Sequence, residues 1–307
     1  MGVNQNTIRS QQGEEPMSES HSGYYLPEPS RWPLIGSVGL FFLFGGLALA
    51  LNGVGIGSLI MVVGFAGVLI MVFGWFSTVI QESESGRYNS QVDKSFRWGM
   101  GWFIFSEVMF FAAFFGALFY ARMYSVPWLG GEGAKVSTHT LLWPAFEALW
   151  PLLKLPDPKG FTEAAEPMSA SGLPAINTLL LLSSGATVTW AHWGLREDNR
   201  RQLIEGLILT IALGVLFLVF QGIEYSHAYS ELNLRLTSGI YGTTFFLLTG
   251  FHGAHVTLGV IMLSVILLRS IKGHFTPDRH FAFEGVAWYW HFVDVVWLAL
   301  FVSVYWL

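Results

Sequence analysis

Long apolar segments constrain the fold of this chain more than any other feature. They cover, with Arg, Lys, Pro or Gly residues between them, roughly residues 33–51, 54–80, 98–121, 173–195, 202–225, 238–268 and 281–307. About 20 apolar residues are enough for a helix to cross the hydrocarbon core of a bilayer. Only 12% of the residues are charged, against about 25% in soluble domains. The sequence therefore predicts an all-α integral membrane protein with seven transmembrane helices.

The connections between these segments divide the chain into parts. A polar tail at 1–32 precedes two segments that a very short turn at 52–53 joins. We therefore expect a two-helix hairpin over 33–80. A cytoplasmic linker at 81–97 leads to a five-helix bundle over 98–307, and we expect a cleft between the hairpin and the bundle.

The remaining connections predict how the chain is oriented. The only long one, 122–172, contains an apolar stretch, Leu141–Leu153, that is too short to span and is expected to lie at the interface. With the N-terminus inside, the outer short connections contain Arg235 alone. The inner segments contain Arg9, Arg31, Arg87, Lys94, Arg97, Arg196, Arg200, Arg201, Arg269, Lys272 and Arg279. The positive-inside rule then predicts a cytoplasmic N-terminus and a periplasmic C-terminus. We expect a bacterial inner membrane rather than a mitochondrial one.

Five ionisable groups lie within the apolar segments. Glu107 is near the middle of the third segment, where a carboxylate costs about 2.5 kcal/mol or more. Its helical neighbours offer no hydrogen bond, so Glu107 needs a partner from another segment or must stay protonated. His252 and His255 stand at i,i+3 in the sixth segment, and His291 and Asp294 have the same spacing in the seventh.

These five groups allow three interpretations. A metal or haem site is compatible with the spacing, but a di-iron bundle would need more carboxylates. A proton or ion path would need groups at several depths, whereas these groups lie at one level. Pairing among themselves is the default, because buried polar groups in lipid must find partners. Pairing is therefore the interpretation that we favour, with no catalytic residue and no metal ligand assigned in this chain, and the other two interpretations stay open.

The last inner connection offers Arg269, Lys272 and His274 to anionic lipid headgroups, although the same cations also serve the positive-inside signal. The net charge of −5 and the absence of a basic cluster argue against binding of nucleic acid.

Four strings in the sequence resemble one known family. They are FIFSEVMFFAAFF (103–115), TWAHWGL (189–195), GIYGTTFFLLTGFHGAHVTLG (239–259) and FEGVAWYWHFVDVVWLALFVSVYW (283–306). They resemble subunit III of the haem-copper, aa3-type cytochrome c oxidase, and the resemblance runs from about Trp32 to the C-terminus. The family implies a subunit without a redox centre. Haem a, haem a3 and copper are expected in partner subunits, which oxidise cytochrome c and reduce oxygen to water.

The resemblance also implies roles for particular residues. Glu107 matches the buried, carbodiimide-reactive glutamate of the family, and the pair of His252 and His255 matches its histidine partner. Phospholipids are expected in the V-shaped cleft, with headgroup contacts at Arg269, Lys272 and His274. Gln81 stands where the family often has arginine, which puts one lipid contact in doubt.

The family's proposed roles are to stabilise subunit I, to support proton uptake, to slow turnover-linked inactivation and to guide oxygen. Two alternatives stay open. Subunit III of a quinol oxidase usually lacks the first hairpin, so residues 33–80 favour the cytochrome c type. A stand-alone transporter is disfavoured because the chain has no ladder of polar groups across the membrane.

Overall fold

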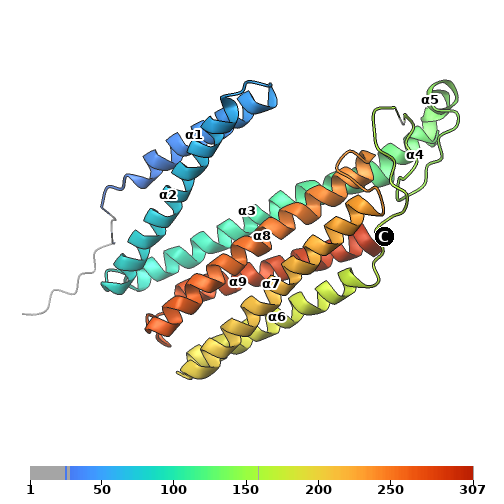
Figure 1. Ribbon diagram of the computed structural model, residues 1–307. Helices are drawn as coiled ribbons and strands as arrows, with labels where there is room; N and C mark the ends of the chain where they lie inside the picture. Colours follow the sequence, from blue (N-terminus) through green and yellow to red (C-terminus); the bar gives the residue numbers. More distant parts are fainter. Residues whose placement is uncertain (1–24, 26–27, 158, 307) are drawn as a thin grey trace, which may run out of the picture. The chain divides into compact units, whose positions relative to one another are not determined.

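The computed structural model describes residue 25, residues 28–157 and residues 159–306, so most of the predicted tail at 1–32 lies outside the described residues. Within those ranges the regular elements are all helices, as Figure 1 shows. The all-α prediction is confirmed. The described part divides into two compact units, which meet in the sequence at Asp93 and Lys94.

The first unit is built on two long helices, α1 (Trp32–Leu51) and α2 (Gly57–Glu84), which lie side by side. The connection between them is longer than the predicted turn at 52–53. The indole nitrogen of Trp32 donates to the hydroxyl of Thr78 at 3.1 Å, which joins the start of α1 to the end of α2.

Two glycines allow these helices to approach closely. A Cβ atom added at Gly46 would collide with the backbone of Met61, and one added at Gly64 would collide with the backbone of Leu43. Small residues at such positions are what close packing in lipid requires, because helices there associate through van der Waals contact. Large apolar side chains such as Phe41 and Phe73 point outward and are at least 70% exposed, as expected for a lipid-facing surface.

The predicted linker at 81–97 is mostly helical, which differs from our expectation. Helix α2 continues to Glu84, since no Pro or Gly interrupts its polar end, and α3 (Ser90–Tyr120) begins after a connection of five residues. The side-chain oxygen of Asn89 accepts from the backbone N–H of Val92 at 3.0 Å and so caps the first turn of α3. A local capping signal therefore starts α3 well before its apolar stretch.

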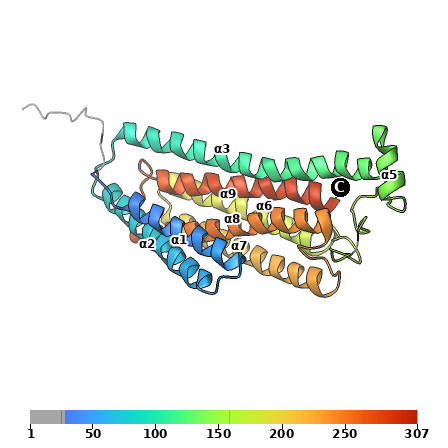
Figure 2. The same ribbon diagram turned by 90° about the horizontal axis from the view of Figure 1, so that it is seen from above.

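The second unit is a bundle of long helices. Four of them are α6 (Leu173–Arg196), α7 (Arg200–Ser230), α8 (Gly239–Lys272) and α9 (Phe281–Leu300). Each of these helices packs against the next one in the chain, and α6 also packs against α9. Helices that follow one another in the chain run in opposite directions, and α3 lies along α8 and α9 (Figures 1 and 2). Ring pairs join α3 to both, Phe110 with Phe251 at 5.0 Å and Phe103 with Tyr289 at 6.3 Å between centroids.

Six helices of the described part are long and apolar enough to cross a membrane. They are the helices that begin at Trp32, Gly57, Ser90, Arg200, Gly239 and Phe281. Helix α6 has 24 residues but is not among them. Polar side chains lower its hydropathy: Asn177, Thr178, Ser183, Ser184, Thr187 and Thr189. The predicted count of seven spans therefore rests on α6.

Two tryptophans of α9 lie at the centre of the bundle. Trp290 and Trp297 are 0% exposed. Each indole N–H donates to a hydroxyl of α6, Trp290 to Ser184 and Trp297 to Thr178, both at 2.9 Å. Buried indoles need such partners, so the polar residues that make α6 less apolar also join it to α9.

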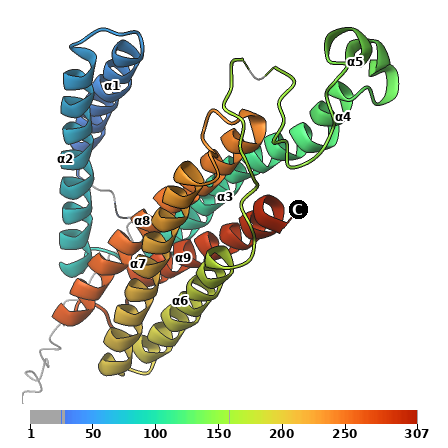
Figure 3. The same cartoon turned by 45° about the vertical axis from the view of Figure 1, so that its right-hand side comes forward.

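The long connection at 122–172 is tied to the bundle. It contains the short helices α4 (Val126–Leu129) and α5 (Val136–Leu142), and most of the predicted interfacial stretch, 141–153, is irregular. Its later part runs past the turn between α7 and α8 (Figure 3), where the N–H of Ala165 donates to the carbonyl of Leu232 at 2.9 Å.

Candidate functional site

Glu107 of α3 contacts His255 of α8. Its carboxylate oxygen Oε2 lies 2.9 Å from Nε2 of the imidazole, and the two side chains are 22% and 14% exposed. The rings of Phe110, Phe111 and Tyr289 surround the imidazole at 5.0 to 6.3 Å between centroids. Glu107 therefore has a hydrogen-bond partner on another helix, and aromatic rings surround this partner.

The second nitrogen of His255 fixes how this pair shares protons. Nδ1 lies 2.6 Å from the carbonyl oxygen of Phe251, an acceptor, so Nδ1 must carry a hydrogen and donate it. The bond at Nε2 then has two forms. Either a protonated Glu107 donates to Nε2, or a doubly protonated imidazole donates to the carboxylate. The pair is electrically neutral in both forms, because one proton is shared between the two residues.

His252, the other histidine of the pair on α8, does not contact Glu107. It is 1% exposed, and its Nε2 donates to the carbonyl of Val293 on α9 at 3.2 Å. Its ring packs against Phe217 and Trp297, at 5.6 and 5.1 Å between centroids. Among the described residues its Nδ1 finds no hydrogen-bond partner. His252 therefore belongs to the packing between α8 and α9.

His291 and Asp294 form a loose polar pair on α9. Nδ1 of His291 lies 3.6 Å from Oδ2 of Asp294, and its Nε2 lies 3.3 Å from the hydroxyl of Thr189 on α6. A Cβ atom at Gly185 would collide with the Asp294 carboxylate, which shows how closely this acid approaches α6. The pair therefore lies within α9, and both of its side chains approach α6.

The three residues expected at lipid headgroups occupy different environments. Arg269 is 8% exposed, and its guanidinium lies over the ring of Phe275 at 4.6 Å. The connection after α8 thus covers the guanidinium of Arg269, and its contact with a headgroup stays a prediction. Lys272 is exposed in the last turn of α8, and His274 is half-buried just beyond it.

A cluster that the sequence analysis missed lies where α6 ends and α9 begins. Among the described residues, one group of three could hold a metal ion: His192, His280 and Glu284, whose ligand atoms lie within 4.8 Å of one another. Arg97 of α3 forms an ion pair with Glu284. The spacing of His280 and Glu284, i and i+4, was a signal in the sequence, but nothing there indicated that His192 joins them.

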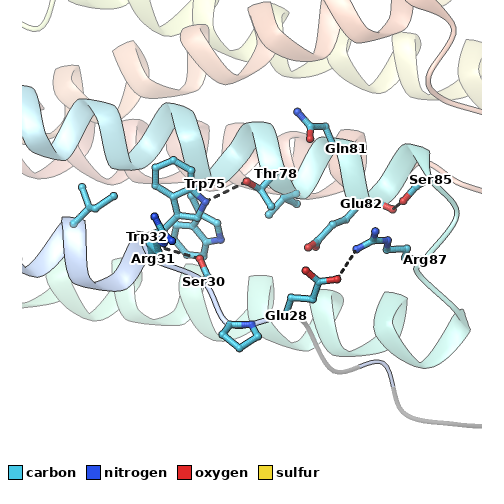
Figure 4. Close-up of a pocket in the computed structure, with 13 residues that line it drawn as sticks. Glu28, Ser30, Arg31, Trp32, Trp75, Thr78, Gln81, Glu82, Ser85 and Arg87 are labelled. Carbon is cyan, nitrogen blue, oxygen red and sulfur yellow. Dashed lines mark hydrogen bonds and ion pairs between the residues drawn. The ribbon is translucent and has the colours of Figure 1, made fainter.

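The first unit has a groove of about 740 Å³ at the start of α1 and the end of α2. It contains two cations and two acids, Arg31 and Arg87 with Glu28 and Glu82. Figure 4 shows Arg87 facing Glu28, with Nη1 and Oε1 at 3.8 Å. Two indole rings, those of Trp32 and Trp75, form part of the apolar lining. A groove with both charges and aromatic rings suits a zwitterionic, amphiphilic ligand.

Long apolar helices with ionisable groups paired between them define a multi-spanning integral membrane protein. Comparison with known proteins identifies the family. The family model of cytochrome c oxidase subunit III matches residues 21–147 and 138–307. This chain belongs to the cytochrome c oxidase subunit III family.

Several curated relatives carry the name cytochrome c oxidase subunit 3. The protein of Formosania lacustris is 41% identical over 281 residues, which cover 91% of this chain and 95% of the relative. The proteins of Hippopotamus amphibius and Scyliorhinus canicula are each 40% identical with the same coverage of both chains. The resemblance that the four strings indicated is thereby confirmed.

Proposed function

We propose that this chain is a non-redox subunit III of a proton-pumping terminal oxidase. Partner subunits carry haem a, haem a3 and copper, oxidise cytochrome c and reduce oxygen to water. The observation that carries this proposal, beside the family, is the contact between Glu107 and His255. It can hold and exchange one proton, but it offers no ligand set for a redox centre.

In this role the chain stabilises subunit I, supports proton uptake into it and guides oxygen through lipid. Seven transmembrane helices, α6 included, form a hairpin and a five-helix bundle with a lipid-filled cleft between them. The N-terminus lies on the side where Lys and Arg gather. The relatives compared come from animals, so a bacterial inner membrane stays a prediction beside a mitochondrial one.

A phospholipid in the groove of the first unit is part of this proposal. Arg31 and Arg87 suit the phosphate of a headgroup, and Glu28 and Glu82 suit its ammonium. These arginines also compensate for Gln81, which lines the same groove where the family often has arginine. Double replacement of Arg31 and Arg87 by Gln should reduce the phospholipid retained after purification. The matched replacement Arg235→Gln should leave it unchanged.

Purification of the tagged chain from native membranes tests the main assignment. We expect a haem-copper partner to co-purify and to give the visible spectrum of haem a. Purification of the chain without any haem protein from membranes that contain active oxidase would contradict the assignment. Removal of the chain should leave a partner that still reduces oxygen but loses activity over successive turnovers.

A further inference from the structure

We propose that His192, His280 and Glu284 form a binding site for a divalent cation of the zinc class, at the end of the bundle where α6 ends and α9 begins. Neither Glu107 nor its partner His255 takes part. The site would join α6 to α9 and lies at the end of the second unit that contains the connections to α7 and from α8 (Figures 1 and 3).

The distances between the ligand atoms fit such an ion. Oε1 of Glu284 lies 3.3 Å from Nε2 of His280 and 3.7 Å from Nε2 of His192. In a tetrahedral zinc site with bonds of about 2.0–2.1 Å, neighbouring ligands lie roughly 3.3 Å apart. Two edges of the tetrahedron are therefore nearly formed. The third, between the two imidazoles, is at most 4.8 Å and needs only a small movement of one ring.

Hydrogen bonds and an ion pair already orient the ligand atoms toward one another. Nδ1 of His280 donates to the carbonyl of Thr276 at 3.1 Å, which leaves the lone pair of Nε2 on the side of Glu284. Nε2 of His192 is buried and has no hydrogen-bond partner among the described residues. Arg97 forms its ion pair with Oε2 of Glu284, so that Oε1 faces the two histidines. Outer partners of this kind orient the ligands in metal sites.

Burial and chemistry favour the same class of ion. The side chains of His192, His280 and Glu284 are 25%, 10% and 15% exposed, which leaves access for an ion and room for a water ligand. The ring of Phe283 packs against His192 at 5.3 Å between centroids and restricts its rotation. The two imidazoles favour zinc over magnesium or calcium, and a carboxylate is a common third ligand of zinc beside two histidines. The chain has no cysteine that would compete for zinc.

Zinc binding to the full-length chain in detergent tests the proposal without its oxidase partners. A tag without histidine is required, and chelator-treated protein is dialysed against radioactive zinc. We expect one tight equivalent, which is lost in His192→Gln and in His280→Gln. The control His274→Gln changes a neighbouring histidine outside the cluster and should retain it. Equal zinc content in all four proteins would overturn the proposal.

X-ray absorption at the zinc edge of the wild-type chain covers the case in which a variant fails to fold. The expected spectrum shows two imidazoles and oxygen ligands at about 2.0–2.1 Å. A spectrum with one imidazole or none, or an absence of bound zinc in folded wild-type chain, would exclude this site. The result is independent of the proposed function, because neither measurement requires oxidase activity.

Discussion

Glu107 and His255 lie 2.9 Å apart although 148 residues separate them in the sequence. The imidazole takes part through Nε2 because its Nδ1 is committed to the carbonyl of Phe251. A single shared proton therefore keeps the pair neutral, and a neutral pair avoids most of the cost of charge in an apolar environment.

The first prediction concerns this proton. Replacement of His255 by Leu removes the partner of Glu107, so an ionised carboxylate would have no counter-charge among the surrounding rings. Infrared difference spectra of the intact complex should show a protonated-carboxyl band at neutral pH that is stronger than in the wild type. The double variant with Glu107→Gln should lose that band. If the double variant keeps the band of the His255→Leu variant, the band belongs to another acid and the prediction is wrong.

The second prediction concerns the packing of Trp290. A Cβ atom at Gly259 would lie 2.7 Å from the Trp290 ring, which is fully buried and has no room to move. Gly259→Ala should lower the free energy of unfolding by about 1–3 kcal/mol, as overpacking does. Gly253→Ala on the same helix meets no atom within 4 Å and should stabilise α8 by about 0.5–1 kcal/mol. Thermal unfolding in detergent compares the two, and equal effects would refute the packing argument.

The third prediction concerns a buried acid of α7 that accepts a hydrogen bond from a tyrosine near the C-terminus. The hydroxyl of Tyr305 donates to Oε1 of Glu224 at 2.5 Å, and both residues are buried. Tyr305→Phe should cost about 1–3 kcal/mol, because it leaves the carboxyl without this donor. Combining it with Glu224→Met removes both polar groups and should recover most of the loss. Strict additivity of the two changes would show that the bond contributes nothing. Tyr120→Phe, at an exposed tyrosine, is the control.

The fourth prediction is a pH dependence in the first unit. Burial raises the pKa of the Tyr88 phenol, and the hydrogen bond that it donates to Glu82 at 2.8 Å raises it further. The hydrogen bond of Tyr88 therefore stabilises the folded chain fully below pH 10, the ordinary pKa of tyrosine. Its contribution declines above pH 10, because Tyr88 loses its proton at a lower pH in the unfolded chain than in the folded one. Spectrophotometric titration of wild type against Tyr88→Phe should show one late-ionising tyrosine missing. A difference at or below pH 10 would contradict this.

The fifth prediction tests the orientation, using the absence of natural cysteines. Ser85→Cys lies between α2 and α3, and Ser169→Cys lies in the long connection; both positions are exposed. In sealed right-side-out vesicles a membrane-impermeant maleimide should label Ser169→Cys at once. It should label Ser85→Cys only after detergent is added. The reverse pattern would invert the proposed topology.

Much of the fold was predictable because apolar segments of spanning length leave few alternatives to helices. The helix ends were less predictable. Local effects at Asn89 and in the polar end of α2 extended helices through the expected linker, and hydropathy does not report such effects. The lower hydropathy of α6 has a structural reason that only the packed bundle reveals, since Ser184 and Thr178 serve the two buried tryptophans.

The candidate site was half predictable. A lone acid in an apolar segment requires a partner, and the sequence offered two histidines on one face. Which of them reaches Glu107 depends on how α8 is rotated against α3 and α9. In the observed rotation His252 packs beside Trp297 of α9, and His255 faces α3. The cluster of His192 with Glu284 combines residues of two helices whose contact no local pattern indicates.

The docking of the long connection has a consequence for the order in which the chain matures. Ala165 is synthesised before α7, yet its backbone partner, Leu232, follows that helix, and the side chain of Asn233 bonds to the carbonyl of Glu163. Until the chain has been synthesised as far as Asn233, these groups lack their native hydrogen-bond partners. The contacts that hold the connection to the turn between α7 and α8 can therefore form only after Leu232 and Asn233 have been synthesised.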